Sequence, residues 1–338
     1  MKPSQLDLSR ETGCTTGACR TMAVYRKRSP ARRISRPALL SFSLLLCLFM
    51  IEKASLAQEV ALTFDDLPAH APLPPGVTRA GVAKQIIKAL ESAHVPKSYG
   101  FMNAGKLQKV PEDVEVLKLW RVAGLPLGNH TYSHMSLNAN TVEAFEQDIQ
   151  ANEPLLDSMM HGKDWRWLRY PYLWEGDTRE KRRAIRSYLA EHKYHIAQVT
   201  LDFEDWAWNS PYARCSAKND TQAIEQLKAS YLSTAAEYIS FGQQMAKLLY
   251  GRDIKHVLLL HVGAFDAVML PQLIDLLKQR GFKLVTLQQA EKDPAYRSDP
   301  DMGLQWGGTL LEQMIEARHL QIPPHQEKPM KELDAMCR

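Results

Sequence analysis

The sequence predicts an α/β fold built from parallel strand–helix units. Seven short apolar runs alternate along the chain with segments whose apolar residues recur at helical spacing. Gly, Pro, Asn or Asp residues stand where several of these helical segments should begin or end. Regular alternation of strands and helices is typical of parallel sheets, either an open doubly wound sheet or a barrel. A chain of 338 residues is long enough for one barrel or for about two smaller domains.

The predicted strands are the apolar runs, and the predicted helices lie between them. We expect strands at residues 59–64, 98–102, 125–128, 165–170, 195–201, 256–260 and 282–287. We expect helices at residues 77–92, 111–123, 141–160, 178–191, 221–250 and 266–280. A further short helix is predicted at 309–319, within a tail that we expect either to pack on the domain or to be disordered, and not to form a carbohydrate-binding module.

The first 57 residues have the order of a secretory signal peptide. A basic stretch at 26–36 precedes a largely apolar run at 38–51, and small residues at 55 and 57 flank a suitable cleavage bond. The apolar run is too short to cross about 30 Å of hydrocarbon as a helix that rises about 1.5 Å per residue. We therefore expect export to the periplasm or the medium, with membrane contact only through an uncleaved signal segment.

The charge distribution argues against a nucleic-acid partner. The whole chain has a net charge of +4, but residues 1–57 carry ten Lys or Arg and three Asp or Glu, so the remainder is mildly acidic. A Gly-x-Gly-x-x-Gly motif after the first predicted strand and a phosphate-binding loop are both absent from the sequence, so no nucleotide is expected.

Two cysteines, Cys215 and Cys337, would remain after removal of residues 1–57. Export would place them in an oxidising compartment, where they could form a disulfide. Nothing in the sequence brings the two positions within bonding distance, so two separate thiols are the favoured prediction.

Polar and charged side chains follow five of the predicted strands. In a parallel barrel the carboxyl ends of the strands form the active face, so these groups should converge on one site. The five segments are Thr63-Phe64-Asp65-Asp66, His130-Thr131-Tyr132-Ser133-His134, Arg169-Tyr170-Pro171-Tyr172, Asp202-Phe203-Glu204-Asp205-Trp206 and Leu259-Leu260-His261.

Three of these residues have the chemistry of a metal site. Adjacent carboxylates such as Asp65 and Asp66 need not face the same way, so one can bind a cation while the other accepts a proton. His130 and His134 are four residues apart, which in a helical turn puts both imidazoles on one face, ready to reach a single metal. One carboxylate and two imidazoles leave a fourth position for water, as catalytic zinc requires. The set predicts metal-assisted hydrolysis, and it has too few ligands for a two-metal phosphoesterase.

Taken in order, the five segments resemble the five motifs of the polysaccharide deacetylases, carbohydrate esterase family four, which share the NodB homology domain. The resemblance covers about residues 59–288 and implies a distorted (β/α)7 barrel in a single catalytic domain. We accordingly divide the chain into an export segment at 1–57, a catalytic domain at 58–290 and a C-terminal extension at 291–338.

The resemblance also implies the roles of individual residues. Asp66, His130 and His134 would hold one divalent ion, with Zn²⁺ the expected metal. Asp65 would act as the general base and His261 as the general acid.

Other residues would support those five. The resemblance implies that Arg169 pairs with the base, that Asp205 orients His261, and that the backbone N–H of Tyr172 helps stabilise the oxyanion. It also implies that Trp206 and Leu259 line the acetyl pocket. From its position just past the third motif, we expect Trp174 to contact substrate, and His70 is a further candidate for the cleft.

The function that follows is an exported metal-dependent deacetylase acting on N-acetylated sugar units of a polysaccharide or oligosaccharide. The alternatives are an O-acetyl esterase on polysaccharide and a sugar-binding protein that has lost catalysis. Loss of catalysis should first remove Asp65 or His261, and both are present. The sequence departs from the family pattern at Leu67, where Gly is usual, and at Val262, where Asp is common, so we expect the sugar subsites to differ.

Overall fold

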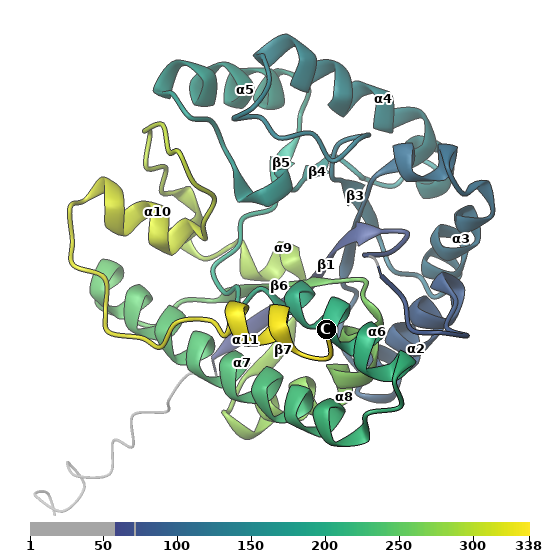
Figure 1. The fold of residues 1–338 in the computed structure, drawn as a ribbon. Coiled ribbons are helices and arrows are strands. Elements are labelled where there is room, and N and C mark those ends of the chain that lie inside the picture. Colours follow the sequence, from purple (N-terminus) through teal and green to yellow (C-terminus); the bar gives the residue numbers. More distant parts are fainter. Residues whose placement is uncertain (1–57, 71) are drawn as a thin grey trace, which may run out of the picture. The chain divides into compact units, whose positions relative to one another are not determined.

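The computed structural model of the protein describes residues 58–70 and 72–338. Within this part, seven parallel strands form a curled sheet whose outer face is covered by helices (Figure 1). The predicted α/β fold of parallel units is confirmed, and so is the distorted barrel that the resemblance implies. The predicted export segment lies outside the described residues. None of the helices in the described part is both long enough and apolar enough to span a membrane.

All seven predicted strands are present, and several are shorter than expected. They are β1 (Glu59–Leu67), β2 (Tyr99–Met102), β3 (Leu127–Asn129), β4 (Trp167–Leu168), β5 (His195–Ile196), β6 (His256–His261) and β7 (Lys283–Val285). Their order across the sheet is β5-β4-β3-β2-β1-β6. β6 pairs with one edge of β1, while β2 and β7 share the opposite edge.

The sheet closes through the segment that follows β5. His195 pairs with β4, whereas Leu201 bridges Leu258 of β6. The predicted strand at 195–201 is therefore divided between two neighbours, which is why its ladder is interrupted and β5 itself is only two residues long. This division is the distortion of the barrel.

The six predicted helices are confirmed with small shifts at their ends. They are α2 (Arg79–Ser92), α3 (Val114–Val122), α4 (Val142–Met160), α5 (Arg179–Glu191), α7 (Thr221–Tyr250) and α8 (Ala264–Gln279). Side chains of Thr78, Thr141, Thr178 and Asp220 accept backbone N–H groups at four of the helix starts. The predicted tail helix is α10 (Leu310–Ala317), whereas α6 (Asn209–Ala217), α9 (Leu287–Ala290) and α11 (Met330–Ala335) were not expected.

Alternation along β1 shows how the core and the site divide the barrel. Leu62 and Phe64 pack in the large cluster between the sheet and the helices, while Ala61 packs in a small cluster with Tyr99, Phe101, Trp167 and Val257. Thr63 and Asp65 continue the row that begins at Ala61, so the inward face of β1 becomes polar toward its carboxyl end.

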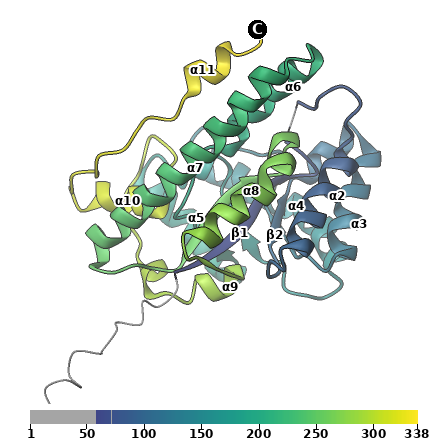
Figure 2. The same cartoon turned by 90° about the horizontal axis from the view of Figure 1, so that it is seen from below.

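The tail packs on the barrel, which was one of its two expected outcomes. α10 contacts α7, and α11 lies beside α6 (Figure 2). Cys215 in α6 and Cys337 after α11 form a disulfide, with their Cα atoms 5.2 Å apart. The favoured prediction of two separate thiols is therefore wrong. The Arg214 side chain donates to the backbone oxygens of Leu333 and Met336, and this contact brings the end of the chain to α6.

Loss of the disulfide should destabilise the domain. The bond joins residues 122 positions apart, and a loop of that size predicts a loss of about 2–5 kcal/mol in Cys337→Ser. Denaturant unfolding measures the change. Reductant should lower the free energy of unfolding of the unmodified protein by the same amount as the substitution does, and it should leave the variant unaffected. Equal unfolding midpoints for the variant and the unmodified protein under oxidising conditions would contradict the cross-link.

Candidate active site

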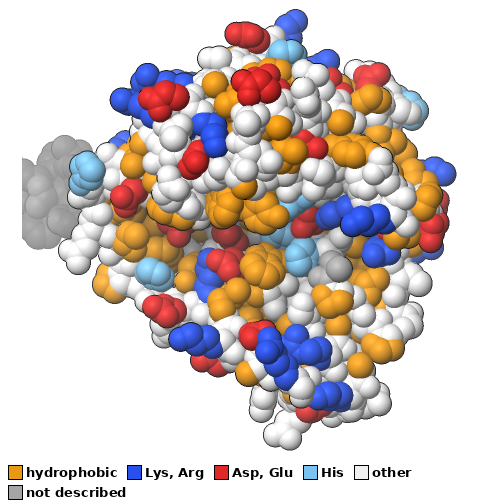
Figure 3. All heavy atoms as spheres, turned by 45° about the horizontal axis from the view of Figure 1, so that its top comes forward, with side chains coloured by type: hydrophobic (Ala, Val, Ile, Leu, Met, Phe, Trp, Pro, Cys, Tyr) orange, Lys and Arg blue, Asp and Glu red, His pale blue; other side chains and the backbone are white. Residues whose placement is uncertain are grey.

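The carboxyl ends of the strands surround a cavity of about 360 Å³. Figure 3 shows it as a hollow with imidazole side chains at its middle. Nine of the sequence-predicted site residues line it, and they come from five segments of the barrel. These nine are Asp65, Asp66, His130, His134, Tyr172, Trp174, Trp206, Leu259 and His261. The other two, Arg169 and Asp205, are buried behind the cavity wall.

Both carboxylates of the Asp pair reach this cavity, although they are adjacent in a strand. β1 runs on to Leu67, past its predicted end, so the pair belongs to the strand itself. Successive side chains of a regular strand point to opposite faces. Asp66, however, has a φ of 72°, in the left-handed region that disfavours non-glycine residues, and this turn brings its side chain to the same side as Asp65. Sparsely populated backbone of this kind is often found at functional sites.

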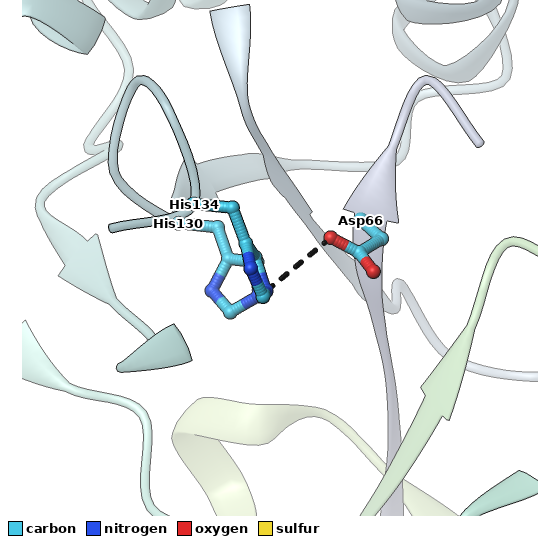
Figure 4. Close-up of side chains that lie close together, drawn as sticks. All are labelled: Asp66, His130 and His134. Carbon is cyan, nitrogen blue, oxygen red and sulfur yellow. Dashed lines mark ion pairs between the residues drawn. The ribbon is translucent and has the colours of Figure 1, made fainter. Parts of the chain in front are cut away.

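Asp66, His130 and His134 form a cluster with the geometry of a metal site. One ligand atom of each lies within 4.8 Å of the others. Figure 4 shows the two imidazoles facing the carboxylate, with Nε2 of His134 3.6 Å from Oδ1 of Asp66. Burial lowers the pKa of both imidazoles, because it outweighs their ion-pair contacts, and it holds the pKa of His130 well below its ordinary value. Both imidazoles are therefore neutral, as metal ligands must be.

The hydrogen bond of His130 also fits this use. Its Nδ1 lies 2.7 Å from the backbone oxygen of Arg169. A neutral imidazole that donates from Nδ1 carries its lone pair on Nε2, which is the nitrogen that faces the cluster. The donor set therefore suits a divalent metal.

The two histidines do not share a helical turn, and that prediction is wrong. Residues 130–134 form a loop in which Thr131 and His134 have φ values of 60° and 61°, which a right-handed helix excludes. The loop is held by Asn103, whose side chain donates to the backbone oxygen of His130, and by Asp148, which accepts from the N–H of Ser133. The imidazole centroids are 4.8 Å apart because of this loop.

Asp65 is held by a buried ion pair with Arg169. The guanidinium Nη1 lies 3.1 and 3.2 Å from the two carboxylate oxygens, and both side chains are almost completely buried. Burial raises the pKa of Asp65 to about 6, even though the positive charge of Arg169 opposes the shift. A carboxylate with such a pKa is ionised at neutral pH and more basic than an exposed one, as a general base needs.

His261 is paired with Asp205 on the other side of the cavity. Its Nδ1 lies 2.7 Å from one carboxylate oxygen, and its backbone N–H donates to the other at 2.7 Å. Burial would lower the pKa of His261, but the Asp205 carboxylate outweighs burial and raises the pKa to about 10. The side chain is therefore an imidazolium at neutral pH, able to donate a proton.

A third carboxyl group, that of Asp266, supports Asp205 from behind. Burial and the neighbouring Asp205 raise the pKa of Asp266 well above its ordinary value, so it is protonated. Tyr231 and Asn209 donate hydrogen bonds to it at 3.1 and 2.9 Å. Asp266 was not predicted as a site residue, because it lies inside α8 and outside every motif.

Two further residues lie at the Asp66 carboxylate, namely Lys106, which was not predicted, and His70, which was a candidate. Lys106 follows β2 and places its Nζ 2.9 Å from Oδ1 of Asp66 and 3.0 Å from its backbone oxygen. His70 lines the cavity with Nε2 3.8 Å from Oδ2 of Asp66 and its ring 5.4 Å from that of His261. Burial favours the neutral carboxyl, yet Lys106 and the imidazoles hold the pKa of Asp66 far below its usual range. The rule that polar groups follow parallel strands would have found Lys106.

The tail also reaches the cavity. Gly307 lines it, and a side chain at this position would overlap the backbone oxygen of Tyr172 and the ring of Trp174. Tyr172 has a φ of 60° and a half-exposed side chain. The absence of a side chain at Gly307 thus lets the tail support the loop that carries both aromatic residues.

A sequence model of the family described as polysaccharide deacetylase matches residues 52–197. This chain carries a polysaccharide deacetylase domain. The matched residues include the Asp pair, the two histidines and Arg169.

Named relatives of the deacetylase domain come from a fungus. A chitin deacetylase of Arthroderma benhamiae is 23% identical over 246 residues, covering 72% of this chain and 55% of that protein. A probable peptidoglycan-N-acetylglucosamine deacetylase of the same fungus is 21% identical and covers 74% of this chain and 48% of that protein. This chain therefore spans about half the length of each relative. Among solved structures, the chitin deacetylase of Colletotrichum lindemuthianum has a TM-score of 0.47 at 23% identity, covering 69% of this chain and 88% of that one.

The pairing of His261 with Asp205 can be tested without substrate. In Asp205→Asn the carboxylate that raises the pKa of His261 is removed, so this pKa should fall from about 10 toward the ordinary value of 6.5. An NMR titration of the His261 imidazole measures the change. Asp202→Asn is the matched control, because the Asp202 carboxylate lines the same cavity but, within the described residues, forms neither a hydrogen bond nor an ion pair with His261. An unchanged pKa in Asp205→Asn would contradict the described pairing.

Proposed function

We propose that this protein is an exported, metal-dependent deacetylase that removes acetyl groups from N-acetylated sugar units of a polysaccharide or oligosaccharide. The observation that carries the proposal is the division of labour within the Asp pair. Asp66 forms a cluster with both His130 and His134, whereas Asp65 is paired with Arg169 and approaches only His130, whose Nε2 lies 3.7 Å from Oδ2 of Asp65. The family match and the two named relatives support an acetylated glycan as substrate.

Asp66, His130 and His134 would hold one divalent ion, and Zn²⁺ best suits a carboxylate with two neutral imidazoles. When bound, such an ion lowers the pKa of water and polarises the acetyl carbonyl.

The proton transfers belong to the chain's own residues. Asp65 would accept a proton from the attacking water, and Arg169 keeps the carboxylate in place through both of its oxygens. His261 would donate a proton to the departing amine, which is a poor leaving group unless it is protonated. Asp205 accepts from Nδ1 of His261 and so directs Nε2 toward the cavity.

Other cavity residues would bind the substrate and its oxyanion. The backbone N–H of Tyr172 would donate to the oxyanion of the tetrahedral intermediate. Trp206 and Leu259 would line the acetyl pocket, and Trp174 would stack on a sugar ring. The remaining tryptophans of this region, including Trp167 and Trp208, are buried in the core.

Export is supported by two independent features. Residues 1–57 have the order of a signal peptide, and the Cys215–Cys337 disulfide suits an oxidising compartment. We place the catalytic domain at 58–290 and treat 291–338 as an extension that completes the cavity wall through Gly307. The protein would act in the periplasm or the medium.

Acetate release from N-acetylglucosamine oligomers tests the proposal. The purified protein should release acetate, lose this activity on chelation and regain it with zinc. Asp65→Asn should retain the metal, measured by elemental analysis, yet lose about 10²- to 10⁴-fold in turnover, because it removes only the general base. Asp66→Asn should lose metal and activity together.

Three results would contradict the proposal. Full activity after exhaustive chelation would exclude the metal, and near-normal turnover in metal-loaded Asp65→Asn would exclude the carboxylate base. Release of no acetate from any acetylated glycan would exclude the activity itself.

A further inference from the structure

A second cavity, of about 670 Å³, adjoins the one described above. The two share four lining residues, namely Asp66, His70, His134 and Tyr172. They therefore form one continuous cleft that extends to both sides of the Asp66 cluster. Each half has the size of a site that holds a small organic ligand, so a glycan lying in the cleft would place different sugars in the two halves.

The two halves differ in charge. The first half contains Asp202, Glu204 and the exposed ring of Trp206. The second half contains Arg79, Lys106 and Lys109. Figure 3 shows Lys and Arg side chains gathered on one side of the imidazoles and hydrophobic side chains on the other. We call the second half the basic half of the cleft.

The cationic groups of the basic half are not all neutralised. Nη1 of Arg79 lies 3.3 Å from Asp113, which lines the same cavity. Lys106 is paired with Asp66. Lys109 is exposed, and within the described residues it enters no ion pair. By contrast, Glu204 in the other half is neutralised by Lys328, whose Nζ lies 2.9 Å from its carboxylate.

The pairing of Lys106 is tied to the metal ligands. Its partner is Oδ1 of Asp66, the same oxygen that lies 3.6 Å from Nε2 of His134. A cation bound to the cluster would compete with Lys106 for that oxygen. In the loaded protein, therefore, two ammonium groups would face the basic half without a carboxylate partner.

This positive charge is local to the cleft. Residues 58–338 carry fewer Lys and Arg than Asp and Glu, so the basic half is not part of a generally basic surface. A glycan that binds in the basic half must therefore carry negative charge on the part that lies next to the reacting sugar. Ammonium groups bind carboxylates through charge-assisted hydrogen bonds.

We propose that the basic half, through Lys109 and Lys106, binds a carboxylate on the sugar adjacent to the acetylated one. The preferred substrate is then a glycan in which N-acetylated sugars alternate with carboxylate-bearing sugars. This inference rests on the proposed function and specifies its substrate class. The carboxylate can belong to a uronic acid or to a lactyl ether, and both carry the same charge.

Three tetrasaccharides distinguish these sources. In the first, N-acetylglucosamine alternates with glucuronic acid. In the second, it alternates with N-acetylmuramic acid. The third contains N-acetylglucosamine at every position. Acetate release gives kcat and KM for each. The unmodified protein should prefer at least one carboxylated substrate over the neutral one by about tenfold in kcat/KM, and the preference should weaken at high salt.

Variants of Lys109 test the contact itself. Lys109→Gln should abolish the preference, mainly by raising KM for the carboxylated substrate, while Lys109→Arg should retain it. Lys118→Gln is the matched control, because Lys118 is exposed on α3 outside the cleft and its loss should leave the preference unchanged.

The outcomes separate this inference from the proposed function. Suppose that the neutral substrate releases acetate and that Lys109→Gln and the unmodified protein have the same ratio of kcat/KM between the carboxylated and neutral substrates. This result would overturn the inference and leave the proposed function intact. If no substrate releases acetate, the proposed function fails, and calorimetric binding of the same tetrasaccharides to zinc-loaded protein decides the inference. Tighter binding of a carboxylated tetrasaccharide that is lost in Lys109→Gln would support it, and equal binding of all three would overturn it.

Discussion

The site depends on one buried side chain, that of Arg169. Its guanidinium lies inside the barrel, where it donates to both oxygens of Asp65, to Thr63 and to the backbone of Ala197. Its own backbone oxygen accepts from Nδ1 of His130. One residue therefore fixes the carboxylate on β1 and the orientation of an imidazole after β3. Removal of one partner of a buried pair costs about 3–5 kcal/mol, so the barrel and the site are stabilised by the same contact.

Several residues in or beside the cavity wall have backbone that the barrel holds in unfavourable conformations. Asp66, Thr131, His134, Tyr172 and Glu204 all have left-handed φ values between 57° and 72°. Each such residue costs of the order of 1–3 kcal/mol, which persists only where the surrounding structure determines the conformation. These residues lie in or beside segments anchored by the sheet and by buried side chains such as Asn103. The cavity is consequently formed before substrate arrives, as electrostatic catalysis requires.

The sequence predicted the strands well because each is a buried apolar run between helical segments, and it predicted the carboxyl-end residues because parallel strands end at the same face. It failed where the outcome depends on contacts between distant residues. The conformation of the loop at 130–134 depends on hydrogen bonds with Asn103 and Asp148. The Cys215–Cys337 bond joins positions 122 residues apart. Gly307 approaches Tyr172 from the tail. Local periodicity contains none of this information.

We propose that Asp66, His130 and His134 together hold a single divalent ion while Asp65 stays paired with Arg169. Diffraction from zinc-soaked crystals, recorded at the zinc absorption edge, would locate this ion and its ligands. We expect one anomalous peak bonded to the Asp66 carboxylate and to Nε2 of His130 and His134, with Lys106 displaced from Asp66 and the Asp65–Arg169 pair intact. A peak bonded to Asp65, or no peak at the cluster while Lys106 stays on Asp66, would contradict it.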